Sequence, residues 1–243
     1  MSQTMTLTRI ESKLFVRDWA GLFFVFVLPL GLLTVFSLIG GGEASPEDGI
    51  PASFLPTMAI GIGIALLGMA TLPMILAGYR EKGVLRRMST TPVKPVKLLA
   101  AQLLLHLIAA VLVIGLILGA GALFFDAALP SAPLPFVVAA ALYSAAQLSI
   151  GLLIAGLVPT AKAASVVGNI LLFPSMFFAG VWTPGDVMPE SIRWLRDVTP
   201  MGAGMTSMQD AWSGQWPGTV SLIALVVAIA GCLAVAARFF RWE

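Results

Sequence analysis

Charged side chains are scarce in this chain. Of its 243 residues only 11% are Asp, Glu, Lys or Arg, whereas 58% are hydrophobic, and the mean hydropathy is +0.96. A typical soluble domain carries roughly 25% charged residues. The shortage of charge therefore excludes an ordinary soluble domain and indicates a protein whose surroundings are largely lipid.

Cysteine and histidine are almost absent, with one of each, Cys232 and His106. A single cysteine excludes an intrachain disulfide and a cluster of thiolate ligands. A single histidine leaves a histidine-based metal site or catalytic dyad within the chain without its second member. The G-x-x-x-x-G-K-[ST] phosphate loop is also absent. We therefore expect no catalytic residue, no metal and no bound cofactor on this chain, which is not predicted to be an enzyme by itself.

What the chain does have is six long apolar runs. Each is long enough to cross a bilayer, because about 20 helical residues span the roughly 30 Å of hydrocarbon. The runs contain no Asp, Glu, Lys or Arg in their interiors and cover residues 20–40, 54–78, 98–124, 135–158, 165–182 and 218–238. A barrel would instead show alternating segments of about ten residues. The sequence therefore predicts an all-α membrane protein with six transmembrane helices, which form one domain over residues 1–243.

The cations concentrate on one side of the predicted membrane topology. Six crossings place both termini on the same side as segments 79–97 and 159–164. That side holds twelve of the fourteen Lys and Arg residues, and the other side holds only Arg193 and Arg196. Because cationic loops near helix ends stay in the cytoplasm, we expect a multi-pass protein of the bacterial plasma membrane with both termini cytoplasmic.

Residues 6–19 precede the first run and show helical periodicity. Thr8 and Glu11 have the spacing of a capping box. An apolar face and a cationic stripe recur along the segment, formed by Leu7, Ile10 and Leu14 and by Arg9, Lys13 and Arg17 respectively. This pattern predicts an interfacial helix on the inner leaflet. Ordinary positive flanking charge without a further role is the alternative.

Residues 183–217, between the fifth and sixth runs, contain two short amphipathic pieces that Thr199 and Pro200 separate. Neither piece is long enough to cross a bilayer. The second piece carries a stripe at helical spacing, formed by Met201, Met205, Met208 and Trp212. We expect an external re-entrant helical hairpin; the alternative is a folded external loop with a methionine core.

Few polar side chains interrupt the runs. His106 lies in the third run, about two turns from its cytoplasmic end, and Gln102, Gln147 and Asn169 are uncharged. An ionisable side chain inside a bilayer is a candidate functional group, so His106 either packs against a neighbouring helix or lines a polar path. Buried acids, which ion-coupled transporters usually carry, are absent from the runs. An ion gradient is therefore not the expected source of energy.

The segment Tyr79 to Lys97, YREKGVLRRMSTTPVKPVK, carries six Lys and Arg residues, one acid, one glycine and two prolines. It resembles the cytoplasmic loop of ABC type-2 transporter permeases, R-E-x-G-[TS]-[LF]-[ERK]-R-L followed by a proline. The matching residues are Arg80, Glu81, Gly83, Leu85, Arg87 and Pro92. Met88 replaces the usual leucine, and Val84 stands at the hydroxyl position.

A second motif joins the last two runs. The stretch FAGVWTPGDVMPESIRWLRDVTPMG resembles the family pattern G-x-x-x-P, four residues, P, then W-[LI] and a later P-[LM]. The residues that fit are Gly180, Pro184, Pro189, Trp194, Leu195, Pro200 and Met201. The family's more typical Pro-Leu-Thr-Tyr run is replaced by Pro200-Met201-Gly202-Ala203. In size and character the chain is most similar to the daunorubicin-resistance-like subgroup of these permeases.

The resemblance implies the transmembrane domain of an ABC exporter, which works with two copies of a separate ATPase and a second permease copy, identical or a close paralogue. ATP and Mg would bind to the partner ATPase. The family's loop contacts that ATPase, which implies coupling residues Arg80, Glu81, Lys82, Gly83, Leu85, Arg86, Arg87 and Met88. A loop that only enforces topology is the alternative.

In the family the first and fifth spans line the translocation path. The path residues implied here are Phe23, Phe26, Phe36, Asn169, Phe173, Met176 and Phe177, with His106 of the third span as a further candidate, and the outer gate would comprise Pro184, Pro189, Trp194, Pro200 and Met201. Aromatic and thioether surfaces suit a hydrophobic or amphipathic cargo, such as a drug, an antibiotic or a lipid-like molecule. The alternatives are export of a polysaccharide or glycolipid precursor and a non-transporting scaffold or sensor subunit. Membrane lipids are expected neighbours, and nucleic acid is not an expected partner.

Overall fold

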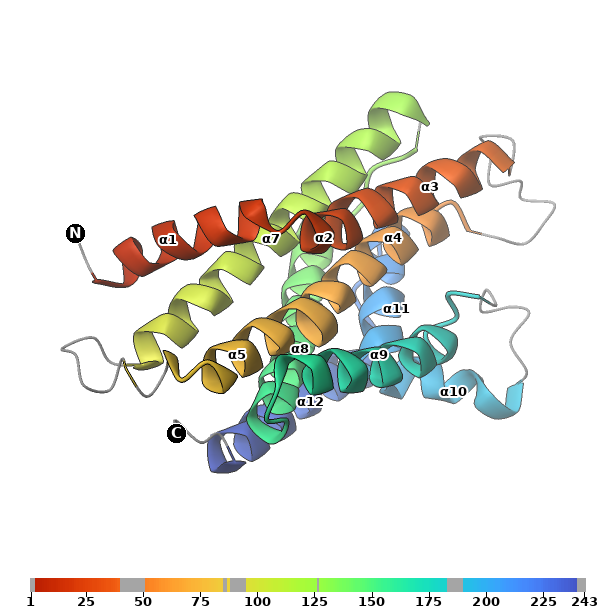
Figure 1. Cartoon of the computed structure of the whole chain (residues 1–243). Coiled ribbons are helices and arrows are strands. Elements are labelled where there is room, and N and C mark those ends of the chain that lie inside the picture. Colours follow the sequence, from red (N-terminus) through yellow and green to blue (C-terminus); the bar gives the residue numbers. More distant parts are fainter. Residues whose placement is uncertain are drawn as a thin grey trace.

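The computed structural model describes residues 3–39, 51–84, 87, 95–125, 127–182 and 190–239, and every regular element within these ranges is helical. The elements in chain order are α1 (Gln3–Arg17), α2 (Trp19–Leu22), the π-helical turn η1 (Phe23–Val27), α3 (Leu28–Ile39), α4 (Phe54–Ala65), the π-helical turn η3 (Leu66–Thr71), α5 (Leu72–Glu81), α7 (Pro95–Phe124), α8 (Pro133–Leu157), α9 (Ala161–Phe178), α10 (Glu190–Val198), α11 (Pro200–Trp212) and α12 (Thr219–Phe239). Figure 1 shows them as one helical bundle.

All six predicted spans are confirmed as helices long and apolar enough to cross a membrane. They cover Trp19–Ile39, Phe54–Glu81, Val96–Phe124, Pro133–Leu157, Ala161–Phe178 and Thr219–Arg238. The fifth helix begins at Ala161 and not at residue 165 as expected, because the Thr160 side chain caps it by accepting a 3.2 Å hydrogen bond from the Ala163 amide. The turn before it is accordingly shorter than predicted.

The second span is the centre of the bundle. In its most apolar window 83% of the residues are buried, compared with 17% in the first and sixth spans. α3 packs on α4, and α9 packs on α5 and η3, so the first and fifth spans flank the second on two sides (Figure 1). α8 and α12 pack along each other behind them. The outward apolar side chains of the peripheral spans are left for lipid or for another membrane subunit to cover.

Both π-helical turns precede a proline by the same spacing. η1 ends two residues before Pro29, and η3 ends two residues before Pro73. Proline has no N–H to bond the carbonyl four residues earlier, and its ring crowds that carbonyl. A wider turn relieves the crowding: the Leu28 amide, for example, bonds to the Phe23 carbonyl five residues back. The prolines thus explain why the first two spans depart from regular α-helix at these points.

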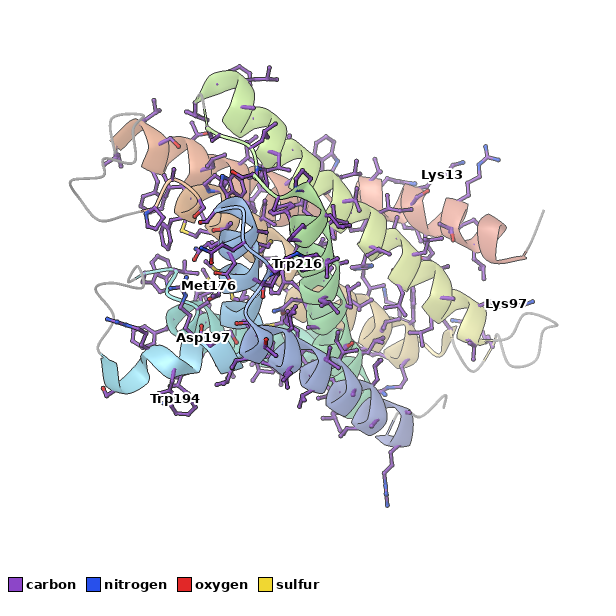
Figure 2. The ribbon with its side chains drawn as sticks, turned by 180° about the vertical axis from the view of Figure 1, so that it is seen from behind. Lys13, Lys97, Met176, Trp194, Asp197 and Trp216 are labelled. Carbon is purple, nitrogen blue, oxygen red and sulfur yellow. The ribbon has the colours of Figure 1, made fainter. Side chains whose placement is uncertain are left out.

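The ends of the bundle differ in charge. α1, the end of α5, the start of α7 and the end of α12 lie toward one end, on the left in Figure 1. Figure 2 shows Lys13 and Lys97 at this end, and Trp194 and Asp197 at the opposite end. The sequence-based grouping of segments on two sides of a membrane is therefore matched by the arrangement of the helices.

The segment predicted as a hairpin contains two helices, α10 and α11, which meet at Thr199. The methionine stripe of α11 is fully buried at Met201, Met205 and Met208, where α11 packs against α4 and α8. The methionine stripe packs against protein, which is compatible with both expectations for this segment. α10 keeps an exposed Trp194, which points outward in Figure 2.

Candidate coupling site at the cationic end of the bundle

The cationic segment begins where α5 ends. Gly83 has a φ of 65°, and the Lys82 and Gly83 amides bond to the carbonyls of Gly78 and Arg80 at 3.0 and 2.9 Å. A left-handed glycine after the last helical residues is a common helix end. Glu81 and Lys82 are exposed there, as is Arg87, whose Nη2 donates to the Lys82 carbonyl at 2.9 Å.

Three predicted coupling residues, Leu85, Arg86 and Met88, lie outside the described residues. The remaining ones are brought together at one end of α5. Two of them, Arg80 and Glu81, bind the ends of other helices, which the sequence interpretation did not include.

Arg80 binds the C-terminus of α8. Its Nη1 donates to the Gly156 carbonyl at 3.4 Å, and its Nη2 donates to the Val158 carbonyl. The last carbonyls of a helix lack partners within the helix and carry the negative end of its dipole. A guanidinium is well suited to this position because its several N–H donors lie in one plane and can bond to neighbouring carbonyls.

Glu81 binds the N-terminus of the next helix. Its Oε2 accepts a 2.9 Å hydrogen bond from the Ala161 amide, the first residue of α9. A carboxylate is favoured there because the first amides of a helix are unpaired and carry partial positive charge. Arg80 and Glu81 therefore fasten the end of α5 to both helices that meet at residues 158–160.

Glu11 of α1 forms a second fastening, on the other side of α5. Its Oε2 accepts hydrogen bonds of 2.6 Å from the Tyr79 hydroxyl of α5 and of 2.6 Å from Nε2 of Gln102 in α7. Only 6% of the Glu11 surface is exposed. Burial raises the pKa of this carboxyl, and the two hydrogen bonds oppose that effect in part.

The expected role of Glu11 in a capping box is wrong. α1 begins at Gln3, so Thr8 and Glu11 lie inside the helix and not at its N-terminus. The buried side of α1 is formed by Glu11 and Phe15, whereas Ile10 of the predicted apolar face is 51% exposed. The signal available in the sequence was the spacing of an acid and an aromatic residue at i and i+4, which share a helix face.

His106 lies in the packing between α7 and α1. It is fully buried, its Nδ1 donates to the Gln102 carbonyl at 2.9 Å, and its ring meets the edge of Phe15 at a centroid distance of 5.9 Å. His106 therefore packs against a neighbouring helix, α1. The structure does not place His106 with the other predicted path residues.

The remaining path residues divide between exposed and buried positions. Phe23, Phe36, Phe173, Phe177 and Asn169 are exposed on the outer faces of the first and fifth spans. Phe26 is partly buried, and Met176 is only 7% exposed and points into the bundle (Figure 2). Met176 thus differs from Phe173 and Phe177 on the same helix in packing into the hydrophobic core of the bundle.

An apolar groove of about 530 Å³ lies between α3 and α7, and its lining contains none of these residues. The groove is lined by Leu30, Thr34, Gly115, Leu116, Gly119, Ala120, Leu123, Phe124 and Phe125.

The predicted outer gate residues that the structure describes are Trp194, Pro200 and Met201, and they differ in exposure. Met201 is fully buried, Trp194 is 59% exposed, and Pro200 opens α11. Pro184 and Pro189 lie outside the described residues. Within the described ranges no group of three His, Cys, Asp or Glu side chains is arranged to hold a metal ion.

The chain has six apolar spans, with the second at the centre of the bundle and a polar site at one end of that span. This arrangement defines a multi-pass helical membrane protein. The family model described as ABC-2 type transporter matches residues 2–212, and the chain belongs to this family. It is thus a transmembrane permease subunit of an ABC transporter, and its family implies a complex with an ATPase partner. No curated protein sequence gives a significant match to it.

Proposed function

We propose that this chain is the permease of an ATP-driven exporter in a bacterial plasma membrane, similar to the daunorubicin-resistance permeases. The segment between α5 and α7 binds a separate ABC ATPase on the cytoplasmic side and receives its movement. The ATPase, present in two copies, holds ATP and Mg. The permease itself works as a pair, with an identical chain or a close paralogue.

The observation that carries the proposal is the attachment of this segment at its start. Arg80 and Glu81 hold the end of α5 to α8 and α9, so a force on the segment acts on three spans together. Lys82, directly beyond them, is exposed and cationic and suits an acidic surface on a soluble partner. A loop that only enforced topology would need the cations but not the attachments.

Charge reversal of Lys82 and Arg87 tests the coupling role. In membranes that contain the natural complex, the variant Lys82→Glu with Arg87→Glu is expected to lose the co-purifying ATPase and its vanadate-sensitive ATP hydrolysis. Arg238→Glu is the matched control, because Arg238 is exposed in the last turn of α12, which ends at the same end of the bundle (Figure 1). Unchanged co-purification and hydrolysis in the double variant would contradict the coupling role. Absence of an ATPase from the wild-type preparation would contradict the proposed function itself.

The cargo is a hydrophobic or amphipathic molecule. The exposed residues of the first and fifth spans, Phe23, Phe36, Phe173 and Phe177, present aromatic surface that a second copy can enclose. Asn169 is the one hydrogen-bonding side chain among them, which disfavours a polysaccharide because sugars need many polar partners.

Two fluorescent probes test the cargo: daunorubicin and a phospholipid with an NBD-labelled headgroup. Phe173→Ala is expected to reduce ATP-dependent movement of one of them in proteoliposomes while the complex still assembles. Ile223→Ala is the control, since Ile223 is similarly exposed on the sixth span. If Phe173→Ala impairs only assembly, Phe173 is a packing residue and not part of the path.

A further inference from the structure

Glu11 joins three elements that are far apart in the sequence. Its two donors lie 68 and 91 residues later, and they stand on opposite sides of the segment proposed to bind the ATPase. Tyr79 belongs to the last turns of α5, and Gln102 belongs to the first turns of α7. A single carboxylate oxygen therefore contacts the helix that enters this segment and the helix that leaves it.

Burial of the Glu11 carboxyl costs free energy unless hydrogen bonds replace its lost contacts with water. A buried carboxylate loses its hydration, and it persists where hydrogen bonds replace that hydration. Both bonds to Glu11 are short, at 2.6 Å, and they replace the contacts with water that the carboxyl loses on burial. Phe15, one turn later on α1, adds an apolar contact with His106 of α7. Glu11 and Phe15 thus hold the same face of α1 to the bundle.

α1 is also joined closely to the first span. It ends at Arg17, α2 begins at Trp19, and Asp18 between them accepts a 3.1 Å hydrogen bond from the Gly21 amide. The linker between the two helices is the single residue Asp18, which caps α2, and so short a linker leaves little freedom between them. A displacement of α1 consequently changes the position of the start of the first span, where Phe23 and Phe26 lie.

We infer that Glu11 is a positioning residue that couples the ATPase-binding segment to α1, and through Asp18 to the first transmembrane span. This inference rests on the proposed function for its last step, in which the ATPase moves the segment. The contacts themselves belong to the isolated chain and are tested without a partner.

The first experiment needs only the purified full chain in nanodiscs. Hydrogen exchange is compared for the wild type, Glu11→Ala and Glu11→Gln, with Ser12→Ala as the control on the adjacent position of α1. Glu11→Ala is expected to lower amide protection in α1 and in the first turns of α7 by about tenfold, the equivalent of losing one hydrogen bond. Glu11→Gln retains a side-chain oxygen that accepts from Tyr79 and Gln102, so it is expected to restore most of the protection.

A double-mutant cycle identifies the partners. Tyr79→Phe and Gln102→Leu each remove one donor, and neither is expected to lower protection further in a Glu11→Ala background. Equal protection in the wild type and Glu11→Ala, or full additivity of Glu11→Ala with both partner variants, would overturn the inference. These outcomes do not depend on whether the chain binds an ATPase.

The second experiment uses the complex with its ATPase. A spin label is placed at Lys13, which is exposed on α1, after Cys232 is replaced by Ala. Trapping with ATP and vanadate is expected to change the label's mobility in the wild type and in Glu11→Gln. In Glu11→Ala the change is expected to fall by about tenfold although ATP is still hydrolysed, the size of a typical coupling between two sites. An unaltered response in Glu11→Ala would refute the coupling role, whereas a preparation without ATP hydrolysis would refute the proposed function.

Discussion

The carbonyl oxygen of Met69 occupies the space that a Cβ atom on Gly168 would need. Met69 lies in η3, four residues before Pro73, and its carbonyl is the one that proline cannot bond. The Met69 carbonyl faces α9 at Gly168, and a glycine is needed there because a residue without a Cβ lets two helix backbones approach closely. The π-helical turn of the second span and the glycine of the fifth span are therefore complementary.

Gly168→Ala is expected to destabilise the packing of α9 on η3. The added methyl group overlaps backbone and not a movable side chain, and such overpacking typically costs about 1–3 kcal/mol. Unfolding in detergent, followed by loss of helical circular dichroism, measures the effect. Gly115→Ala is the control, because a Cβ at Gly115 meets nothing within 4 Å. Equal stability of the two variants would show that α9 moves away without cost.

Arg80→Ala is expected to loosen the end of α8. Its guanidinium supplies donors to the Gly156 and Val158 carbonyls, and removal leaves those helix-end carbonyls without them, at a cost of about 1 kcal/mol for a half-exposed group. Amide exchange over residues 154–163 reports the change. Lys82→Ala serves as the comparison, since Lys82 is exposed two residues away. Similar exchange in both variants would argue against the attachment.

Gly83→Ala is expected to destabilise the end of α5. Gly83 has a φ of 65°, and an L-residue in that region costs about 1–2 kcal/mol. No atom lies within 4 Å of a Cβ built there, so the effect comes from the backbone alone. Gly83→Asn should retain most of the stability because asparagine tolerates this conformation. The comparison is made by thermal unfolding, and no difference between Ala and Asn would contradict the interpretation.

The docking of α1 is expected to depend on pH through Glu11. Burial raises the pKa of this carboxyl above its ordinary 4.5, so the docked state binds a proton more tightly than the undocked state. The resulting stabilisation is fully present below pH 4.5 and is lost as the pH rises through the higher value in the folded protein. Amide protection of α1, corrected for intrinsic exchange, should fall over that window in the wild type and stay level in Glu11→Gln. A level wild-type profile would contradict this expectation.

The membrane orientation is tested by labelling lysines in intact cells. If the cationic end faces the cytoplasm, an amine reagent that does not cross membranes should label neither Lys13 nor Lys82, both of which are exposed. Both should react after the membrane is made permeable. Reaction of either lysine in intact cells would reverse the proposed orientation.

The sequence by itself determined the six spans. A helix in lipid must hydrogen-bond its backbone groups internally and must present about 20 apolar side chains. Each span is therefore visible in the sequence as one continuous apolar run. The position of the cationic segment was equally readable, because charge density along a chain is a local property. The helical spacing of Met201, Met205 and Met208 was also visible, although lipid and a protein core demand the same apolar stripe.

Only the tertiary structure decided which polar residues meet. The sequence pattern assigned Glu11 to a capping box of an interfacial helix, whereas its donors stand 68 and 91 residues away. The same holds for Arg80 and Glu81, whose partners are backbone groups at helix ends and leave no mark on the side-chain pattern. A span boundary follows from the energetics of one segment in lipid. A buried hydrogen bond follows from the packing of several segments, and that packing exists only in the folded chain.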